Sequence, residues 1–446
     1  MHRALARRLL WLLLVVVPTP TGLHAQSEAS GGEDPARPLL RVGTSGDYAP
    51  FSIALGEDRY EGLDVELARR FAADQAMELR FVPFAWPSLL KALAKDRFDL
   101  AWSGITIRPE RSAAGRFSLP ILETGAVALV RPDTWTSLDE LDRPRIRIGV
   151  NAGGHLERVT EQRFPRATRV AIPDNASVLE ALRDGAVEAV VTDSAEAPHW
   201  VAQLGDGVVL GPFTVDRKAA LVHPERGELA ARLDAWLLAR ERDGSLTALR
   251  EEHLGAGSWP ATAEPLAALL AAIDERLSLM PIVAVVKRNS GIPLEVPERE
   301  EVVLDAAAEA VLRAADRRDV VAPPFTLVRA FYRAQMEAAK QVQLDAVRDP
   351  DGAPPEPWPD LDATLRPALL RIGEKIAALL LELPASDAER VHALAAELLR
   401  EPRLARSSRR EIVAALVRLL PKAPDQARTK ARASSPASTG STMQTP

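Results

Sequence analysis

The chain changes character near residue 255, and this change restricts its possible folds more than any other feature. From Leu39 to about Leu254, short β-branched runs alternate with helical segments. Beyond the linker-like segment 255–265 the strand signals end, and a helical pattern rich in Ala, Leu, Glu and Arg continues to about Leu420. Alternation of strands and helices predicts an α/β fold with a mostly parallel sheet. We therefore expect an α/β half followed by an all-α half.

Length and composition limit the classes of protein further. The 446 residues are enough for roughly three domains. The net charge of −6, from 56 basic and 62 acidic side chains, gives no strong basic field and argues against a nucleic-acid partner. The absence of cysteine excludes thiolate catalysis and cysteine-based metal sites.

The first 25 residues have the features of a secretory signal peptide. Arg3, Arg7 and Arg8 precede an apolar run over 9–17, and a small-residue site ends at Ala25. This run is shorter than the about 20 residues that span a bilayer, although an uncleaved anchor is the alternative interpretation. We expect an exported, periplasmic protein whose mature form has no membrane span.

Several local patterns predict individual elements. Buried strands are expected at 40–43, 146–150 and 189–191, and amphipathic helices at 61–74, 86–95 and 176–185. Residues 26–38 form a polar linker, and the Ser/Thr/Pro-rich tail 421–446 is expected to be disordered.

Ordered motifs in the α/β half carry a family resemblance. They are Gly43–Ser52, Gly62–Leu67, Phe98–Leu100, Ser103–Arg111 and Phe117–Pro120. Together they resemble the periplasmic amino-acid-binding proteins, which have the two-lobed "Venus flytrap" fold. The resemblance covers nearly all of residues 39–254, within a domain expected at 39–258. It implies a second lobe at about 132–215, and it implies that Thr106 and Arg111 clamp a ligand carboxylate. A guanidinium matches a carboxylate with two hydrogen bonds, and a hydroxyl adds a third.

A closer resemblance lies within this family. The motifs are Trp86-Pro87, Ser103–Ile105, Asn151–Gly154, Pro173–Asn175 and Thr192–Ala197. They are similar to those of the periplasmic cyclohexadienyl dehydratases, which convert prephenate or arogenate to phenylpyruvate or phenylalanine. This reaction expels hydroxide, a poor leaving group that an acid must protonate.

The resemblance assigns roles to individual residues. It implies that Glu196 is the general acid and Asp193 the usual partner of a ligand amine. It also implies that Phe51 and Trp86 wall the ring, and that Ser103 and Lys218 bind substrate. The alternatives are an exposed helix-start glutamate, two core aromatic residues and a surface lysine.

One departure from the family lies at the start of a helix in the second lobe. His155 stands where a threonine is usual, next to Gly154, whose N–H can hold an anion. A neutral imidazole can also donate a hydrogen bond, so we expect both residues to bind substrate, while the preference between prephenate and arogenate stays open.

Spacing is informative in the helical half. Arg276 and Lys287 are eleven residues apart, which places them within about 20° on one helix face, with Pro281 bending the helix between them. Arg299 and Glu300 begin a later helix, and Gln343 lies in a further helix.

This set resembles the all-helical chorismate mutases, and most closely their exported subclass. The resemblance covers about 262–385, within a domain expected at 259–385. It implies that Arg276 and Arg299 hold carboxylates, that Lys287 and Gln343 contact the ether oxygen, and that Glu300 binds the hydroxyl. Lys375 is a weaker match to an arginine of a late helix, and three cations on a solvated surface are the alternative.

Two departures and one unassigned segment accompany this resemblance. Val296 replaces a frequent acidic residue, and Ala339 replaces a frequent hydroxyl-bearing residue. The helical extension 386–420 has no motif. The rearrangement needs positioned charges and no cofactor or metal.

The two resemblances share one molecule, because prephenate is the product of the mutase and the substrate of the dehydratase. We therefore expect a bifunctional enzyme that takes chorismate to phenylpyruvate without cofactors. The alternatives are a solute-binding protein fused to a mutase, and an inactive scaffold. The oligomeric state, a homodimer included, stays open.

Overall fold

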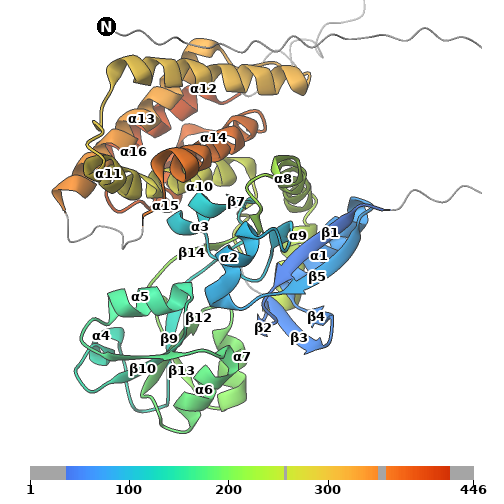
Figure 1. The fold of residues 1–446 in the computed structure, drawn as a ribbon, viewed down its shortest axis with the longest axis vertical. Coiled ribbons are helices and arrows are strands. Elements are labelled where there is room, and N and C mark those ends of the chain that lie inside the picture. Colours follow the sequence, from blue (N-terminus) through green and yellow to red (C-terminus); the bar gives the residue numbers. More distant parts are fainter. Residues whose placement is uncertain (1–36, 256–258, 350–357, 422–446) are drawn as a thin grey trace, which may run out of the picture. The chain divides into compact units, whose positions relative to one another are not determined.

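The computed structural model describes residues 37–255, 259–349 and 358–421, and it contains two α/β lobes followed by a helical domain (Figure 1). The predicted signal peptide and tail lie outside these residues. Within them, no helix is both long and apolar enough to cross a membrane. The expected fold class, a two-lobed flytrap followed by an all-α domain, is confirmed.

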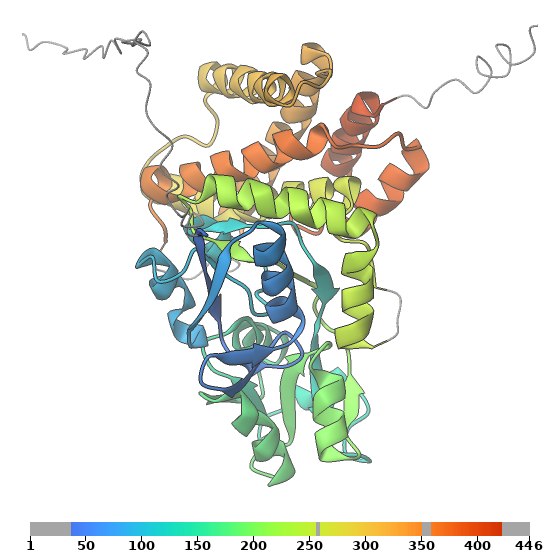
Figure 2. The ribbon, with the colours of Figure 1, turned by 90° about the vertical axis from the view of Figure 1, so that its right-hand side faces the viewer.

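Lobe 1 is built on a five-stranded sheet with the order β5-β1-β6-β15-β7. Strand β1 is the predicted first strand, and it pairs in parallel with β5 and β6. Figure 2 shows helix α1 beside these strands. The strands are β1 (Leu39–Thr44), β5 (Glu78–Pro83), β6 (Leu100–Ala101), β7 (Arg116–Phe117) and β15 (Leu221–Val222), with β2 (Asp47–Tyr48), β3 (Ser52–Gly56) and β4 (Arg59–Glu61) in a separate small sheet.

The helices of lobe 1 come from both ends of the α/β half. The helix expected at 86–95 is a short 3-10 turn, η1 (Trp86–Ser88), followed by α2 (Leu89–Ala94), because Pro87 lies in its first turn. The others are α1 (Leu63–Asp74), α3 (Pro109–Ala114), α8 (Gly227–Arg242) and α9 (Ser245–Leu254).

Lobe 2 has a second five-stranded sheet with the order β11-β10-β12-β9-β13. It begins at Ala126, earlier than the expected 132, because the fully buried strand β9 inserts antiparallel between β12 and β13. Its elements are β9 (Ala126–Val130), β10 (Arg147–Asn151), β11 (Thr168–Ile172), β12 (Ala189–Asp193), β13 (Val208–Leu210), α4 (Leu138–Leu141), α5 (His155–Arg163), α6 (Asn175–Arg183) and α7 (Ala197–Leu204).

The chain crosses between the lobes twice, as the resemblance implies. The crossing strands β8 (Leu122–Thr124) and β14 (Asp216–Lys218) pair antiparallel with each other. This two-stranded connection is the hinge of the α/β half. Lys218, which the resemblance implies is a substrate-binding residue, therefore lies on the hinge itself, and Asp216 lies on the same strand.

The helical domain contains the remaining helices. Helix α10 ends at Ser278 and α11 begins at Met280, so Pro281 in the first turn of α11 accompanies a break where a bend was expected. The elements are α10 (Pro265–Ser278), α11 (Met280–Asn289), α12 (Pro297–Arg317), α13 (Phe325–Arg348), the π-helical turn η3 (Leu361–Leu365), α14 (Arg366–Leu380), α15 (Ala388–Leu398) and α16 (Arg406–Leu419). Helices α15 and α16 pack on α10 and α13, so the extension 386–420 belongs to this domain.

Candidate active sites

A cavity lies between the two lobes, and we call it the interlobe cavity. Both lobes and the hinge contribute to its wall. The lining residues are Tyr48, Trp86, Gly104, Thr106, Arg111, Asn151, Gly154, His155, Leu156, Asn175 and Lys218. Six of the predicted dehydratase-site residues are in this set: Trp86, Thr106, Arg111, Gly154, His155 and Lys218.

The predicted carboxylate clamp forms one wall of the interlobe cavity. Arg111 Nη1 donates to the carbonyl oxygen of Thr106 at 2.9 Å, and the Arg111 guanidinium carbon lies 5.9 Å from the centre of the Trp86 ring. Burial lowers the pKa of Arg111 to about 9, so the group stays charged at neutral pH. A fixed cation beside an aromatic face is suited to an anion that carries an unsaturated ring.

Lys218 is buried, so the alternative of a surface lysine is wrong. Its Nζ lies 2.8 Å from Asp193 Oδ2 and 2.9 Å from Thr106 Oγ1. The Asp193 carboxylate also accepts hydrogen bonds from Thr124 Oγ1 at 2.8 Å and from the Ala195 amide at 2.9 Å. Asp193 is fully buried and does not line the cavity, so the lysine separates it from a ligand.

Glu196 precedes helix α7 as its N-cap residue and is 1% exposed, so the alternative of an exposed glutamate is wrong. Asn175 Nδ2 donates to Glu196 Oε1 at 2.9 Å, and the Thr192 hydroxyl donates to the other oxygen. Burial raises the pKa of Glu196 to about 8, which keeps the carboxyl protonated at neutral pH. The acid lies one hydrogen bond from the cavity wall, through Asn175.

His155 is held by the hinge. Its Nε2 lies 2.8 Å from Asp216 Oδ1 on β14, and Thr214 Oγ1 donates to Asp216 Oδ2 at 3.0 Å. Burial lowers the pKa of His155. His155, which stands where the family usually has a threonine, therefore has a carboxylate partner, and Asp216 orients its imidazole in the cavity wall.

The lobes approach each other closely at Gly153, which has a φ of +75°. A Cβ atom there would lie 2.7 Å from Pro87 Cγ of lobe 1. Glycine is required by the left-handed backbone and by this contact. Arg158 of lobe 2 also pairs with Glu110 of lobe 1. These contacts keep the cavity narrow.

Besides Asp193 and Glu196, two further predicted residues do not line the cavity. Phe51 is fully buried and packs beneath Tyr48, with ring centres 5.0 Å apart, so Phe51 is a core residue and Tyr48 forms the wall. Ser103 is buried with its Oγ 2.9 Å from Ser45 Oγ. The prediction missed Tyr48 and Asn175 as lining residues, although both stand in the motifs that carry the resemblance.

A second cavity lies within the helical domain, and we call it the helical cavity. It brings together five predicted residues: Arg276, Lys287, Arg299, Glu300 and Gln343. The three cations therefore share one cavity, which the alternative of a solvated surface does not explain. The departures Val296 and Ala339 also line this cavity.

The helical cavity carries an excess of positive charge. Lys340 and Arg366, which the prediction did not include, also line it, and Glu300 is its acidic group. Lys340 Nζ lies 3.1 Å from Glu300 Oε2. Burial, assisted by Arg366 and Arg299, lowers the pKa of Lys287, whose Nζ donates to the Leu294 carbonyl at 3.1 Å. An anion in the cavity would relieve this repulsion.

Gln343 presents an unused acceptor in the buried wall of the helical cavity. Its Nε2 donates to the Ala339 carbonyl at 3.3 Å, whereas Oε1 has no hydrogen-bond partner among the described residues. A buried polar atom without a partner is uncommon, and a ligand hydroxyl or a water would satisfy it.

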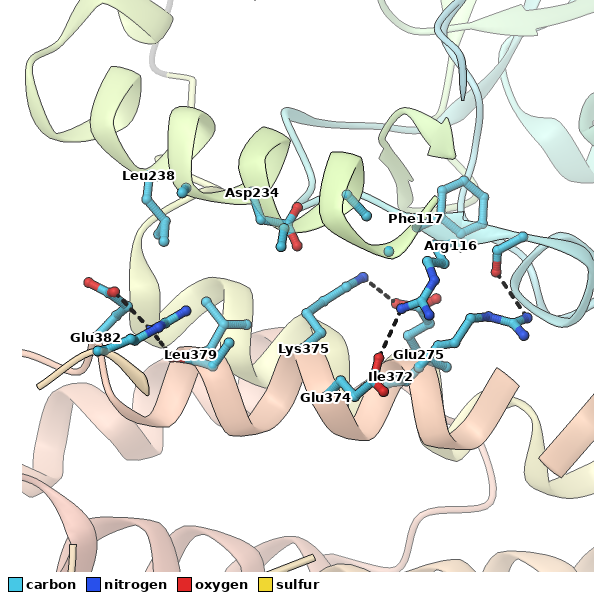
Figure 3. Close-up of a pocket in the computed structure, with 18 residues that line it drawn as sticks. Arg116, Phe117, Asp234, Leu238, Glu275, Ile372, Glu374, Lys375, Leu379 and Glu382 are labelled. Atoms are coloured by element: carbon cyan, nitrogen blue, oxygen red, sulfur yellow. Dashed lines mark hydrogen bonds and ion pairs between the residues drawn. The ribbon is translucent and has the colours of Figure 1, made fainter. Parts of the chain in front are cut away.

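Lys375 was predicted to bind substrate here, and the structure contradicts this. Its Nζ lies 3.2 Å from Glu275 Oε2, in a separate pocket that it shares with Arg116 and Asp234 (Figure 3). The cation that the start of α14 contributes to the helical cavity is Arg366. Arg366 and Lys375 are nine positions apart, which places their side chains about 180° apart around the helix.

Comparisons with known proteins agree with both halves. The chain matches bacterial extracellular solute-binding proteins, family 3, over residues 40–256, and chorismate mutase type II over residues 267–344. The cyclohexadienyl dehydratase of Pseudomonas aeruginosa is 34% identical over 228 residues, covering 50% of this chain and 84% of that protein.

Two further proteins are similar to the α/β half. The L-cystine-binding protein TcyJ of Escherichia coli (strain K12) is 26% identical over 249 residues, covering 54% of this chain and 94% of that protein. The crystal structure of AncCDT-1, an ancestral amino-acid-binding protein and precursor of cyclohexadienyl dehydratase, is 32% identical and covers 48% of this chain and 95% of that one, with a TM-score of 0.46.

The two family matches and the dehydratase relative together show the family of this chain. A relative at 34% identity that is covered over 84% of its length shares more than isolated motifs. The chain therefore belongs to the family 3 bacterial extracellular solute-binding proteins, with a cyclohexadienyl dehydratase as a relative, and carries a type II chorismate mutase domain after it.

Proposed function

We propose that this chain is an exported bifunctional enzyme that converts chorismate to prephenate in the helical cavity and prephenate to phenylpyruvate in the interlobe cavity. The observation that carries the dehydratase half is Glu196, a buried carboxylic acid with a pKa raised to about 8, one hydrogen bond from a cationic cavity. The solute-binding family and the apolar segment at 9–17 support export.

The mutase step needs only shape and charge. Arg276, Arg299 and Arg366 would hold the two carboxylates of chorismate in the compact conformer. Lys287 Nζ and Gln343 Nε2 would donate hydrogen bonds to the ether oxygen, on which negative charge develops, and Glu300 would accept a hydrogen bond from the substrate hydroxyl. No nucleophile enters this scheme.

The dehydratase step needs one acid. Arg111 and Thr106 would hold a substrate carboxylate, and Glu196 would protonate the ring hydroxyl as it leaves with CO2. Catalytic hydrogen bonds often form only in the substrate complex, so the intervening Asn175 is compatible with this role. Fusion of the two domains raises the prephenate concentration near the second site.

The test is incubation of the purified full chain with chorismate, followed by product identification. We expect phenylpyruvate from the unmodified protein and accumulated prephenate from Glu196→Gln. Accumulation of prephenate by the unmodified protein would reject the dehydratase half and favour an amino-acid or aromatic-acid binding protein fused to a mutase. Unchanged chorismate would reject both halves.

A further inference from the structure

The imidazole of His155 is held at one of its two nitrogens. Nε2 lies 2.8 Å from Asp216 Oδ1, and an ionised carboxylate only accepts hydrogen bonds, so Nε2 carries a proton. Burial opposes ionisation of Asp216, but the hydrogen bond with His155 outweighs it and lowers the pKa of this carboxyl. The other nitrogen, Nδ1, has no hydrogen-bond partner among the described residues, and His155 lines the interlobe cavity. Nδ1 is therefore the ring nitrogen that remains for a ligand.

Without a ligand the imidazole is neutral at pH 7. Burial lowers the pKa of His155, and this effect outweighs the hydrogen bond and the charge of Asp216. The charged groups around the imidazole come from the hinge, from lobe 1 and from its own helix, and they are Asp216, Lys218, Arg108, Glu110, Arg111 and Arg158. With the one proton on Nε2, Nδ1 only accepts hydrogen bonds, so a carboxylate placed against it would meet a lone pair.

Among the described residues that line the interlobe cavity, one cation has no carboxylate partner. Lys218 Nζ lies 2.8 Å from Asp193 Oδ2, so the charge of this lysine is balanced. Arg111 donates to the Thr106 carbonyl and forms no ion pair with a described residue. These lining residues thus offer one uncompensated positive charge to a ligand.

A ligand with two carboxylates changes this charge balance. Arg111 compensates one carboxylate, and a second buried carboxylate needs a further positive charge. His155 is a lining residue whose side chain ordinarily titrates near pH 7, and a nearby negative charge raises the pKa of an imidazole. A proton on Nδ1 gives the imidazolium two N–H donors, one for Asp216 and one for the ligand. The imidazolium then lies between two carboxylates, which stabilise its charge.

We propose that His155 takes up one proton from solvent when a dicarboxylate enters the interlobe cavity, and that Nδ1 then donates to the carboxylate that Arg111 does not hold. Asp216 is the positioning residue, because it fixes Nε2 and stabilises the imidazolium. The inference rests on the proposed dehydratase function and adds that binding of its substrate is coupled to a proton. The coupling belongs to a position where this chain departs from the dehydratases it resembles, since a threonine there does not titrate.

The first experiment counts the protons taken up on binding. The full chain with Glu196→Gln is used, because it lacks the acid of the proposed reaction and the carboxyl whose pKa is about 8. Prephenate is titrated into this protein at pH 7 by calorimetry, in phosphate and in Tris, two buffers with different ionisation enthalpies. The difference between the two heats gives the number of protons. We expect uptake of about half a proton or more per prephenate.

Smaller uptake, release of protons or absence of prephenate binding overturns the inference. Phenylpyruvate formation by the unmodified chain is measured separately, and it decides whether the dehydratase function stands in each of these cases. Phenylpyruvate, which has one carboxylate, is the matched ligand. We expect it to cause less than about half of the uptake that prephenate causes. Larger uptake with phenylpyruvate overturns the requirement for a second carboxylate and with it the inference.

Variants in the Glu196→Gln protein assign the proton to a residue. His155→Gln keeps a donor for Asp216 without a titratable group, so the uptake should be lost and the prephenate Kd at pH 7 should rise by about tenfold. His392→Gln, at an exposed histidine of α15, is the matched control and should keep the uptake. The rival group is Asp64, whose pKa is raised by burial to about 7 and which accepts from the Gly104 amide. Uptake that persists in His155→Gln would assign the proton to another group and overturn the inference.

A second variant tests the positioning residue. Asp216→Asn keeps the shape of the side chain and removes the negative charge that favours the imidazolium, so the uptake should fall by about half or more. Thr168→Val, at an exposed position of β11, is the control in the same lobe and should leave the uptake unchanged. Unchanged uptake in folded Asp216→Asn would overturn the role of the His155–Asp216 pair.

Discussion

Arg217 Nη1 lies 2.8 Å from Asp274 Oδ2, and this buried ion pair joins the hinge strand β14 to helix α10 of the mutase domain. The neighbours of Arg217 in sequence are Asp216 and Lys218, which serve the interlobe cavity. Asp274 stands two residues before Arg276, which lines the helical cavity. The Arg217–Asp274 contact thus lies between the walls of the two candidate active sites.

The first prediction concerns this contact. Asp274→Asn should destabilise the protein by about 1–3 kcal/mol, because it removes one of the two carboxylates that pair with the buried Arg217 and leaves only Glu123. Asp274 also accepts from the amides of Arg400 and Glu401, so its loss weakens the attachment of the segment before α16. The measurement is the calorimetric unfolding midpoint.

Asp305→Asn is the matched control, because Asp305 pairs with Arg329 on an exposed helix face. It should change the stability by about 0–1 kcal/mol. Equal midpoints for the two variants would contradict a structural role of the Arg217–Asp274 pair.

The second prediction is a pH dependence. The pKa of Glu196 is raised to about 8, so the carboxyl donates a proton below this pH and is ionised above it. We expect prephenate turnover to fall as the pH rises through about 8, whereas chorismate turnover should not follow this profile. Rates of both steps measured between pH 6 and pH 10 would show the difference.

Replacement of the same acid, Glu196, should slow the dehydratase step. Glu196→Gln keeps the shape of the side chain and should lower prephenate turnover by about 10²–10⁴-fold. Glu180→Gln, on the exposed face of α6, should leave it unchanged. Full activity of Glu196→Gln would mean that another group protonates the leaving hydroxide.

The third prediction separates two cations of α14. Arg366 lines the helical cavity, so Arg366→Gln should lower chorismate turnover by about tenfold or more through loss of an anion contact. Lys375→Gln removes the cation that faces Glu275 and should leave the turnover within about twofold. The reverse order of effects in steady-state kinetics would restore Lys375 as the substrate-binding cation.

The fourth prediction compares alanine substitutions at two glycines, which should change the stability of the protein in opposite directions. Gly104 has a φ of +64°, and a Cβ there would lie 2.7 Å from atoms of the Phe51 and Tyr48 rings. Gly104→Ala should therefore destabilise the lobe 1 core by about 1–3 kcal/mol. Gly373 lies inside α14 with open space around it, so Gly373→Ala should stabilise the protein by about 0.5–1 kcal/mol. Thermal midpoints that shift in the same direction would contradict this account.

The sequence by itself determined the order of the two halves and much of each cavity. The alternation of strands and helices decided the α/β fold, because hydrophobic periodicity is a local property. The eleven-residue interval predicted that Arg276 and Lys287 share one face. Although the helix breaks near Pro281, both side chains line one cavity. Thr106 and Arg111 also met as expected, since one short turn and the start of α3 carry both.

Tertiary structure alone decided which side chains reach each cavity and how they are paired. Lys218 and Asp193 come from different strands, β14 and β12, and the tertiary structure brings their charged groups to 2.8 Å. Phe51 and Tyr48 are both aromatic and three residues apart, and packing against Gly104 sends one into the core and the other to the wall. Tertiary structure also decided which cation of α14 reaches the helical cavity. Lys375 pairs instead with Glu275, which is 100 residues away in the chain, and a local pattern does not contain that partner.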